Sequence, residues 1–413
     1  MPVDAVPHSP GQTLSGPVFE YGPHRASAGT APTYSVTITA SFDDIDSDWR
    51  AFQQKAICTP YQRFAWLRIW QETIGEASKV HPVLCRVHGA DGRLVAILPF
   101  GRYQRGPLKV AGWLGDKHMN YFMGLYAPGT AFSACDCRSL LAEIGTQAGI
   151  DVFQLKNQPR TWMGMTNPFA ALPGEPSPSQ AYSTALEPDF DAFYASRPSG
   201  RWKRQLRNKA KKLDELGAVE LRHFVDGDEA VTVLETYLRQ KAVRFAEAGI
   251  TNPFDAEPVQ AFFRRVLAEQ DPREPLFELY ALQQGDDVLA VYGGSGFHDR
   301  FSTSICSITD TCRKQFSPGE QLLKDVIADR CARGDAVLDL GIGESRYKRH
   351  WCPDTDDLID VFVPLSASGH IGALLARSRQ RLKRAIKQNE KAWNMVALLR
   401  TMKGARRTDA KDD

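Results

Sequence analysis

Two neighbouring stretches decide the fold: LFELYALQQGDDVLAVYGGSGFHDRFSTSICSIT, from Leu276 to Thr309, and SPGEQLLKDVIADRCARGDAVLDL, from Ser317 to Leu340. The first contains three segments rich in apolar, aromatic and β-branched residues, and Gly285-Asp286 forms the turn between the first two. Such segments, bounded by turn residues, predict antiparallel strands. In the second stretch, Ser-Pro-Gly opens a helix and the last five residues form a further buried strand. We therefore expect a meander of strands, followed by a helix and a strand that pack on the sheet.

The first half of the chain repeats this order. HPVLCRVHG, from His81, and RLVAILPFG, from Arg93, flank an Ala-Asp-Gly turn. Further along, Pro128-Gly129 precedes a helix and the strand DVFQL, which begins at Asp151. Matching order at similar intervals indicates a duplication. Each half also begins with helices, since apolar residues recur at helical spacing in 59–75, 230–249 and 258–270. The predicted fold class is α+β: two similar domains, each a mostly antiparallel mixed sheet flanked by helices.

The composition of the segments between these elements predicts the domain boundaries. Residues 1–33 are rich in Pro, Gly, Ser and Ala, without an apolar period, and are expected to be a disordered leader. The first domain then covers 34–166, an irregular linker 167–198, and the second domain 199–368. Residues 369–413 are expected to form a basic C-terminal helix and tail.

Composition excludes several classes of protein. With 413 residues and 43% hydrophobic residues the chain is a folded protein, and a net charge of +2 argues against a coat for nucleic acid. The start lacks the features of a secretory signal, and the charge-free run 118–135 is too polar to span a bilayer. The eight cysteines form no C-x-x-C pair, and the nine histidines are dispersed, so we expect no metal site. We expect a cytoplasmic protein with reduced cysteines.

The net charge hides a local imbalance. Residues 371–407 contain eleven Lys and Arg against the single acidic Glu390, so this segment carries +10. Its apolar residues recur at helical spacing, which is typical of a helix that lies on an anionic membrane or docks on a partner. A terminal helix packed on the domain, with its charges in water, explains the pattern equally well.

Three further motifs are candidates for a functional site. VLDLGIGES, from Val337, has a strand running into a Gly-x-Gly turn, but only about 70 residues remain after it, too few for the βα units of a Rossmann domain. FSPGEQLL, from Phe316, is a helix start that can bind an anion through free amides and the helix dipole, with Arg313 and Lys314 just upstream. RWKRQLRNKAKK, from Arg201, contains no acid and is either a solvated helix face or a site that attracts phosphates.

A fourth motif, GESRYKRHW, follows the predicted buried strand. It places Tyr347 and Lys348 just beyond the strand end. A tyrosine there can donate a proton to a leaving thiolate. From spacing alone, a solvated helix with Tyr347 and Trp351 anchored in the core is the simpler interpretation.

Together these segments resemble a known family. Residues 199–364 resemble, in order, the acetyltransferase domain of the cellulose-biosynthesis (CelD-like) proteins, within the GNAT superfamily of acyl-CoA N-acyltransferases. The segments that carry the resemblance are WKRQLRNKAKKLDELG, the strand pair with its Gly-Asp turn, SPGEQLLKDVIADRCARG and VLDLGIGESRYKRHW. The first half resembles the domain in outline only, as a degenerate copy, and the tandem arrangement is similar to that of FemAB-type aminoacyltransferases.

The resemblance implies a site for acetyl-CoA or another acyl-CoA. It would lie in a splay between central strands, with its pyrophosphate held where the meander turns into the next helix. The residues implied are Phe316, Ser317, Gly319, Glu320, Gln321 and Leu322, together with Arg313. Of the spaced glycines usual in a GNAT loop only Gly319 is present, and Pro318 stands where a flexible residue is expected.

The resemblance also implies a mechanism without a covalent intermediate or a metal. An amine attacks the thioester directly, Tyr347 is the first choice of acid for the thiolate, and Glu344 or Asp339 is the candidate base. Asp339 can alternatively be a buried structural residue. Lys348 and Arg204 are expected to bind the substrate.

Three functions follow from the resemblance. The first is acyl transfer to the amine of a sugar, an amino acid or a cell-envelope or exopolysaccharide precursor. The second is FemAB-like transfer from aminoacyl-tRNA, although no nucleic-acid module supports such a partner. The third is a non-catalytic accessory protein of exopolysaccharide synthesis. The basic C-terminal helix can contact the inner membrane or the polysaccharide machinery, which would make the protein membrane-peripheral.

Overall fold

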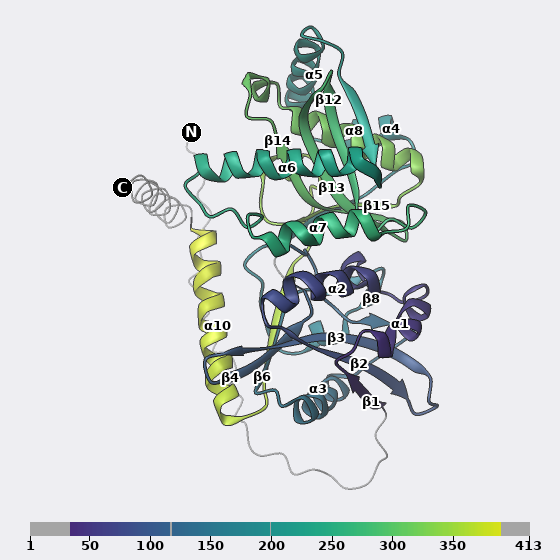
Figure 1. Ribbon diagram of the computed structural model, residues 1–413, viewed down its shortest axis with the longest axis vertical. Helices are drawn as coiled ribbons and strands as arrows, with labels where there is room; N and C mark the ends of the chain where they lie inside the picture. The colour runs from purple at the N-terminus through teal and green to yellow at the C-terminus, as the bar shows by residue number, and fades with distance from the viewer. Residues whose placement is uncertain (1–33, 116–117, 199, 390–413) are drawn as a thin grey trace, which may run out of the picture. The chain divides into compact units, whose positions relative to one another are not determined.

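The computed structural model describes residues 34–115, 118–198 and 200–389 (Figure 1). Two large sheets organise these residues. The first has the strand order β1-β2-β3-β4-β6-β16-β9, with β5 paired to β3, and the second has the order β10-β15-β14-β13-β12-β11. The expected leader and the end of the basic tail, from residue 390, lie outside the described residues.

The first half of the chain contains the strands and helices of the first sheet. Its strands are β1 (Tyr34–Thr39), β2 (His81–Gly89), β3 (Leu94–Arg105), β4 (Leu108–Trp113), β5 (Leu125–Tyr126), β6 (Val152–Pro159), the short pair β7 (Thr161–Trp162) and β8 (Met165–Thr166), and β9 (Gly174–Pro176). Its helices are α1 (Asp46–Gln53), α2 (Phe64–Trp70) with its continuation η3 (Gln71–Gly75), and α3 (Ala134–Ala148), and short helical turns are η1 (Asp43–Ile45), η2 (Pro60–Gln62) and η4 (Pro168–Ala171).

The second half builds the second sheet. Its strands are β10 (Ala181–Ala185), β11 (Glu220–Phe224), β12 (Glu278–Gln284), β13 (Asp287–Phe297), β14 (Arg300–Ile308) and β15 (Val337–Ile342), and β16 (Leu358–Pro364) follows them in the chain. Its helices are α4 (Phe190–Ser196), α5 (Gly200–Asp214), α6 (Gly227–Glu247), α7 (Glu257–Glu269), η5 (Cys312–Phe316), α8 (Pro318–Arg333), α9 (Arg346–Trp351) and α10 (Ala367–Gln388).

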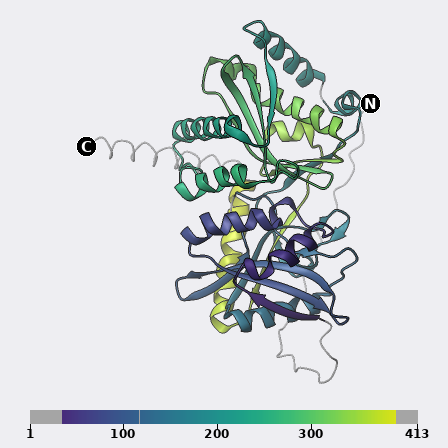
Figure 2. The ribbon, with the colours of Figure 1, turned by 45° about the vertical axis from the view of Figure 1, so that its right-hand side comes forward.

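The predicted α+β class and its repetition are confirmed. In the first half β2, β3 and β4 are antiparallel, α3 follows, and β6 then pairs with β4 in parallel. In the second half β12, β13 and β14 are antiparallel, α8 follows, and β15 pairs with β14 in parallel. Helix α6 covers one face of the second sheet and α8 the other (Figures 1 and 2). These helices bury apolar side chains that alternate along the strands, as the period of a strand requires.

The structure differs from the predicted domain boundaries at two places. Residues 167–198, expected as a linker, contain β9, β10 and α4, and β10 pairs with β15 in the second sheet. Strand β16, expected in the second domain, instead lies between β6 and β9 of the first sheet. Its apolar residues Leu358, Val361 and Phe362 are buried there, and it pairs with backbone groups of β6 that would otherwise form a sheet edge.

The two halves share a continuous apolar core. Trp66 of α2 contacts Phe262 of α7 edge to face, with ring centroids 5.1 Å apart. Nearby, the Arg63 guanidinium donates hydrogen bonds to the carbonyl oxygens of Glu274 and Pro275, at 2.9 and 2.7 Å. Since both halves, as far as the structure describes them within 34–389, belong to one compact unit, side chains of the first half can contribute to a site in the second.

Candidate active site

The candidate site begins where two parallel strands separate. Strands β14 and β15 pair only over Arg300–Ser302 and Val337–Asp339, although β14 continues to Ile308 and β15 to Ile342. Beyond Ser302 and Asp339, the backbone groups on the facing edges of β14 and β15 therefore do not bond to each other and can take other partners. The first half supplies one: the Asn120 side chain donates to the carbonyl oxygen of Thr303 at 2.8 Å and accepts from the amide of Ile342 at 3.4 Å. Asn120 thus bridges the two strands just beyond the point where they part.

Asp339, expected as a base or as a structural residue, lies at this same point. It is fully buried, and both carboxylate oxygens are occupied. Oδ1 accepts from the Tyr121 hydroxyl and the Gly341 amide, both at 2.7 Å. Oδ2 accepts from the Arg300 guanidinium at 3.0 Å and the Ser302 hydroxyl at 3.3 Å. This placement gives Asp339 a positioning role, because it fixes both strands and a residue of the first half.

Tyr347 lies on α9, half-buried against apolar side chains of the second half. Its hydroxyl is in hydrogen-bonding contact with Tyr292 of β13 and Cys306 of β14. Burial is the main cause that raises the pKa of Tyr347 well above its ordinary value, and the neighbouring Cys306 adds to it. The phenol therefore keeps its proton at neutral pH, the state that a general acid requires.

Lys348 and Glu344 point in different directions. The buried Lys348 ammonium donates to the carbonyl oxygens of Gly341 and Ile342, at 3.2 and 3.0 Å, and so fixes the end of β15. Burial lowers the pKa of Lys348. Glu344 is exposed and forms an ion pair with Arg349, also on the surface. Arg204 is exposed on α5 and forms no ion pair among the described residues.

The predicted anion site at the start of α8 has one free amide and one ammonium group. Ser317 adopts a left-handed conformation, φ 57°, and its carbonyl oxygen accepts from the amides of Glu320 and Gln321. Within the described residues the amide of Gly319 has no acceptor, and it points from the positive end of the helix dipole. The Lys209 ammonium on α5 donates to the Ser317 hydroxyl at 2.7 Å. The basic helix α5 thus lies beside the helix start.

The other residues expected around this loop serve other contacts. Arg313 forms an ion pair with Asp287 at the β12–β13 turn rather than facing Ser317. Gln321 donates to the Phe316 carbonyl oxygen at 2.8 Å, and Leu322 is buried in the core. The Glu320 carboxylate lies 3.6 Å from His350 of α9. Helix α9, which carries Tyr347, therefore contacts the first turn of α8.

The sequence interpretation missed the residues that the first half contributes. Asn120 and Tyr121 lie in a stretch that gave no motif. Tyr61 adds a third contact, because Asn120 also donates to its hydroxyl at 2.9 Å. Lys209 was not missed, because it belongs to the run 201–212 that was considered as a site for phosphates; it falls at helical spacing with the buried Leu206 and Leu213 and shares their side of α5.

A comparison with protein families agrees with this geometry. Residues 200–349 match the sequence model of the family described as "Acetyltransferase (GNAT) domain". The second half has the GNAT fold. The matched range runs from α5 to α9 and includes both the separated strands and the start of α8. The first half repeats the strand order of this fold, so the chain has two GNAT-like halves in tandem.

Comparisons with individual proteins gave distant similarities. No curated protein matches the chain. Among solved structures, the C-terminal domain of a putative lysylphosphatidylglycerol synthetase from Agrobacterium fabrum is 9% identical with a TM-score of 0.49, over 81% of this chain and 95% of that one. FemX is 10% identical with a TM-score of 0.49, over 76% and 96%. A tandem GNAT protein from the clavulanic acid biosynthesis pathway is 11% identical with a TM-score of 0.42, over 81% and 99%.

Proposed function

We propose that the second half is an acyl-CoA-dependent N-acyltransferase. The observation that carries the proposal is the separation of β14 and β15 beside the positively charged start of α8. Separated parallel strands offer backbone groups to an extended ligand, and a helix start with a lysine favours a pyrophosphate. The family match of residues 200–349 supports the same chemistry.

The residues present fit an acyl-CoA, although with few loop glycines. The Gly319 amide, the dipole of α8 and Lys209 together can bind two phosphates. Lys209 offsets the missing glycine amides, since an ammonium group binds phosphate without requiring a particular backbone conformation. The acyl-CoA would supply the activated thioester.

Different side chains have different roles in acyl transfer. The nitrogen of the amine forms a bond to the acyl carbon, and the bond from that carbon to sulfur breaks. Tyr347 is protonated and supplies a hydrogen bond or a proton to the departing sulfur. Glu344, an exposed carboxylate just after β15, is the candidate to take the proton from the amine. Asp339 and Lys348 hold β15 in position.

Asn120 supports a short acyl group as the donor. Because its amide bridges the strands where they part, it closes the inner end of the gap. We propose acetyl as the preferred group, and an amine of a sugar, amino acid or exopolysaccharide precursor as acceptor. The resemblance to cellulose-biosynthesis acetyltransferases supports that acceptor class. Asn120→Gly should shift the ratio of kcat/KM values for butyryl-CoA and acetyl-CoA toward butyryl-CoA.

Calorimetry and a thiol-release assay test this function. Acetyl-CoA should bind saturably, and Tyr347→Phe should lower turnover about 10²–10⁴-fold while binding is retained. Tyr34→Phe, a change in β1 of the first half, is the matched control and should leave turnover unchanged. Wild-type turnover in Tyr347→Phe would exclude the acid role. Salt-sensitive tRNA binding without acetyl-CoA binding would favour the aminoacyl-tRNA alternative, and binding of neither would favour a non-catalytic accessory protein.

We also infer that α10 docks on an anionic membrane surface. Its buried side consists of small residues, Gly369, Gly372 and Ala373. On the opposite side Ile371, Leu374, Leu375 and Leu382 are 65, 64, 64 and 61% exposed. They recur at helical spacing and form one apolar stripe.

Cations flank this stripe, namely the exposed Arg379, Arg381 and Lys383. An apolar stripe between cations complements an anionic bilayer surface. Within the described residues, none of the helices combines the length and apolarity needed to cross a membrane.

Co-sedimentation with vesicles tests this contact. Vesicles of phosphatidylcholine with phosphatidylglycerol should bind the protein, and vesicles of phosphatidylcholine alone should bind it far less. Changing both Leu374 and Leu382 to Ser should abolish binding. Leu216→Ser removes a leucine that is 57% exposed elsewhere and should have no effect. Absence of vesicle binding, or self-association that the double variant removes, would contradict membrane docking.

A further inference from the structure

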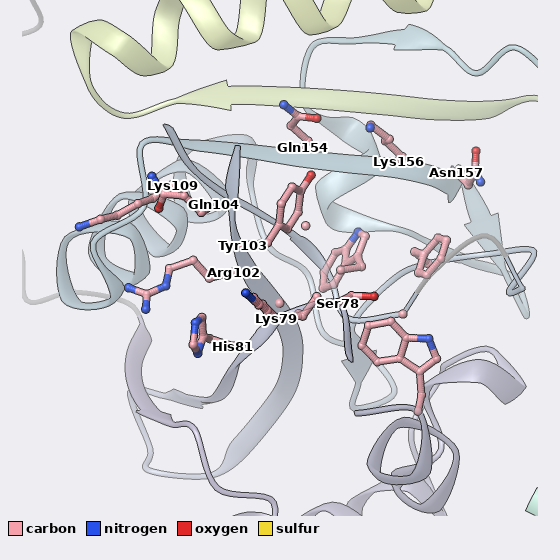
Figure 3. A pocket seen from close by; sticks show the side chains of 17 residues that line it. Ser78, Lys79, His81, Arg102, Tyr103, Gln104, Lys109, Gln154, Lys156 and Asn157 are labelled. Atoms are coloured by element: carbon pink, nitrogen blue, oxygen red, sulfur yellow. The ribbon is translucent and has the colours of Figure 1, made fainter. Parts of the chain in front are cut away.

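The first half contains a cavity that acyl transfer in the second half does not use. Its volume is about 740 Å³, and it is lined by residues of α2, β2, β3, β4 and β6 and of the loops that adjoin them (Figure 3). Cavities that bind small molecules measure about 300–1,000 Å³. The size therefore suits a small organic ligand, which must be identified from the chemistry of the walls.

The charge of the walls is of one sign. Lys79, Arg102, Lys109 and Lys156 line the cavity, and none of its 17 described lining residues is Asp or Glu. Two smaller cavities of the second half, by contrast, are lined by carboxylates as well as cations. A concave surface with cations alone concentrates anions.

Two of these cations lie close together at the C-terminal end of α3, which does not itself line the cavity. A Cβ on Gly149, at the end of α3, would lie 3.7 Å from the Lys109 ammonium and 3.9 Å from the Arg102 guanidinium. Arg102 is held there by a hydrogen bond of 2.8 Å to the carbonyl oxygen of Ala148. A fixed guanidinium beside an ammonium group is suited to the oxygens of a phosphate.

The carboxylates behind the walls already have partners. Asp151 accepts from the backbone amide of Lys109 at 2.9 Å and from the Ser366 hydroxyl at 2.7 Å. Asp360, which is buried near Lys156, accepts from the Ser177 hydroxyl and from the Asn157 amide. Lys109 and Lys156 are exposed and form no ion pair with these acids among the described residues, so both can also interact with a ligand.

Aromatic rings form the remaining wall. Trp70, Trp113 and Phe122 are almost completely buried but line the cavity. Tyr103 projects into its middle, between the side with Arg102 and Lys109 and the side with Lys156 and Asn157 (Figure 3). Aromatic rings stack on planar groups, and side-chain amides such as those of Gln104 and Asn157 hydrogen-bond to their edges.

The corresponding helix start in the first half does not repeat the anion site of the second. The first turn of α3 is capped by Ser133 and by the carboxylate of Asp136, which accepts from the Ser133 amide at 2.8 Å. The Asp136 amide in turn donates to the Ser133 hydroxyl at 3.1 Å, so this helix start is capped by its own side chains. We propose that the first half is a binding module for a phosphorylated small molecule with a planar ring, which binds in this cavity on the sheet and not at the start of α3.

Calorimetry on the full chain with ADP, adenosine and inorganic pyrophosphate as probes tests the proposal. ADP combines a ring with phosphates, and it should bind at least about tenfold tighter than either of the other two. Changing both Lys109 and Lys156 to Glu should weaken ADP binding at least about tenfold. Lys55→Glu, the same substitution at one exposed residue outside the cavity, should change it less than about twofold.

One more variant separates this site from the acyl-CoA site. Lys209→Met should leave ADP binding unchanged, whatever it does to acetyl-CoA binding. Loss of ADP binding in Lys209→Met, an equal loss in Lys55→Glu, or affinity for ADP no greater than for adenosine would overturn the proposal. A failure of acetyl-CoA binding with ADP binding intact would instead count against the proposed function alone.

Discussion

Gly341 is the residue at which the contact between the two halves can be tested most directly. It has φ +70°, and a Cβ added there would lie 2.4 Å from the Asn120 amide nitrogen and 2.7 Å from its Cγ. Gly343 is a matched control, because it also has a positive φ, +96°, but has no described atom within 4 Å of an added Cβ. Both variants therefore share the cost of placing an alanine at positive φ, and Gly341→Ala adds a steric clash with the Asn120 amide.

The expected costs follow from these geometries. An L-residue held at positive φ costs about 1–2 kcal/mol, and this applies to both variants. Insertion of a methyl group into a packed region costs about 1–3 kcal/mol more, and this applies to Gly341→Ala alone. The loss of chain entropy in the unfolded state is the same for both and cancels in the comparison. Gly341→Ala should thus be destabilised by about 1–3 kcal/mol more than Gly343→Ala.

Urea unfolding followed by tryptophan fluorescence measures this difference. A double-mutant cycle then assigns it: in an Asn120→Ala background the obstructing amide is gone, and the cost of Gly341→Ala should fall to that of Gly343→Ala. The reasoning is refuted if the two glycine variants are equally stable in the wild-type background. It is also refuted if Asn120→Ala leaves the cost of Gly341→Ala unchanged.

Two further changes probe buried polar contacts by the same unfolding assay. Tyr121→Phe removes the 2.7 Å hydrogen bond to the Asp339 carboxylate and should cost about 1.5–3 kcal/mol. Tyr237→Phe should cost almost nothing, since the buried Tyr237 hydroxyl has no partner among the described residues, and equal losses would contradict this. Burial on its own raises the pKa of Glu278, but the hydrogen bond from His223 and the charge of Arg330 outweigh it and leave the pKa below its ordinary value. Its stabilising contribution is therefore present above the unfolded-state pKa, about 4.3, and is lost as the pH falls through the lower folded-state value. Glu278→Gln should flatten that part of the acid-unfolding curve, and an unchanged curve would exclude the contribution.

The sequence predicts those parts of the fold whose signals are local. The strands and helix of residues 276–340 were correct because alternation, turn residues and a helix start are all encoded within a few neighbouring positions. Strand β16 lies in a range that the sequence assigned to the second domain, and neither the strand nor its partner was predicted. Its pairing with β6 joins residues about 200 positions apart, and alternation specifies which side chains are buried without specifying the neighbouring strand.

The candidate site shows the same difference between local signals, which the sequence reveals, and contacts between distant residues, which it does not. Tyr347 and Lys348 follow a strand in the sequence, so their position near its end could be predicted. The bridging of β14 and β15 by Asn120 could not, because nothing in the sequence around residue 120 indicates a contact with residues 303 and 342. Asp339 was considered either as a base or as a buried structural residue; it is buried, and its partner Tyr121 became visible only in the structure.

These contacts show that the first half shapes the candidate site of the second half. If the first half served only as a support, its loop between β4 and β5 could be removed without effect on the second sheet. Here that loop supplies Asn120, which fills the gap between the separated strands, and Tyr121, which holds the carboxylate at their branch point. Since the gap is where the proposed thioester would lie, its depth depends on a residue of the other half. The two halves therefore form one structural unit, and a separated second half would have a deeper gap and would lack the Tyr121 hydrogen bond to Asp339.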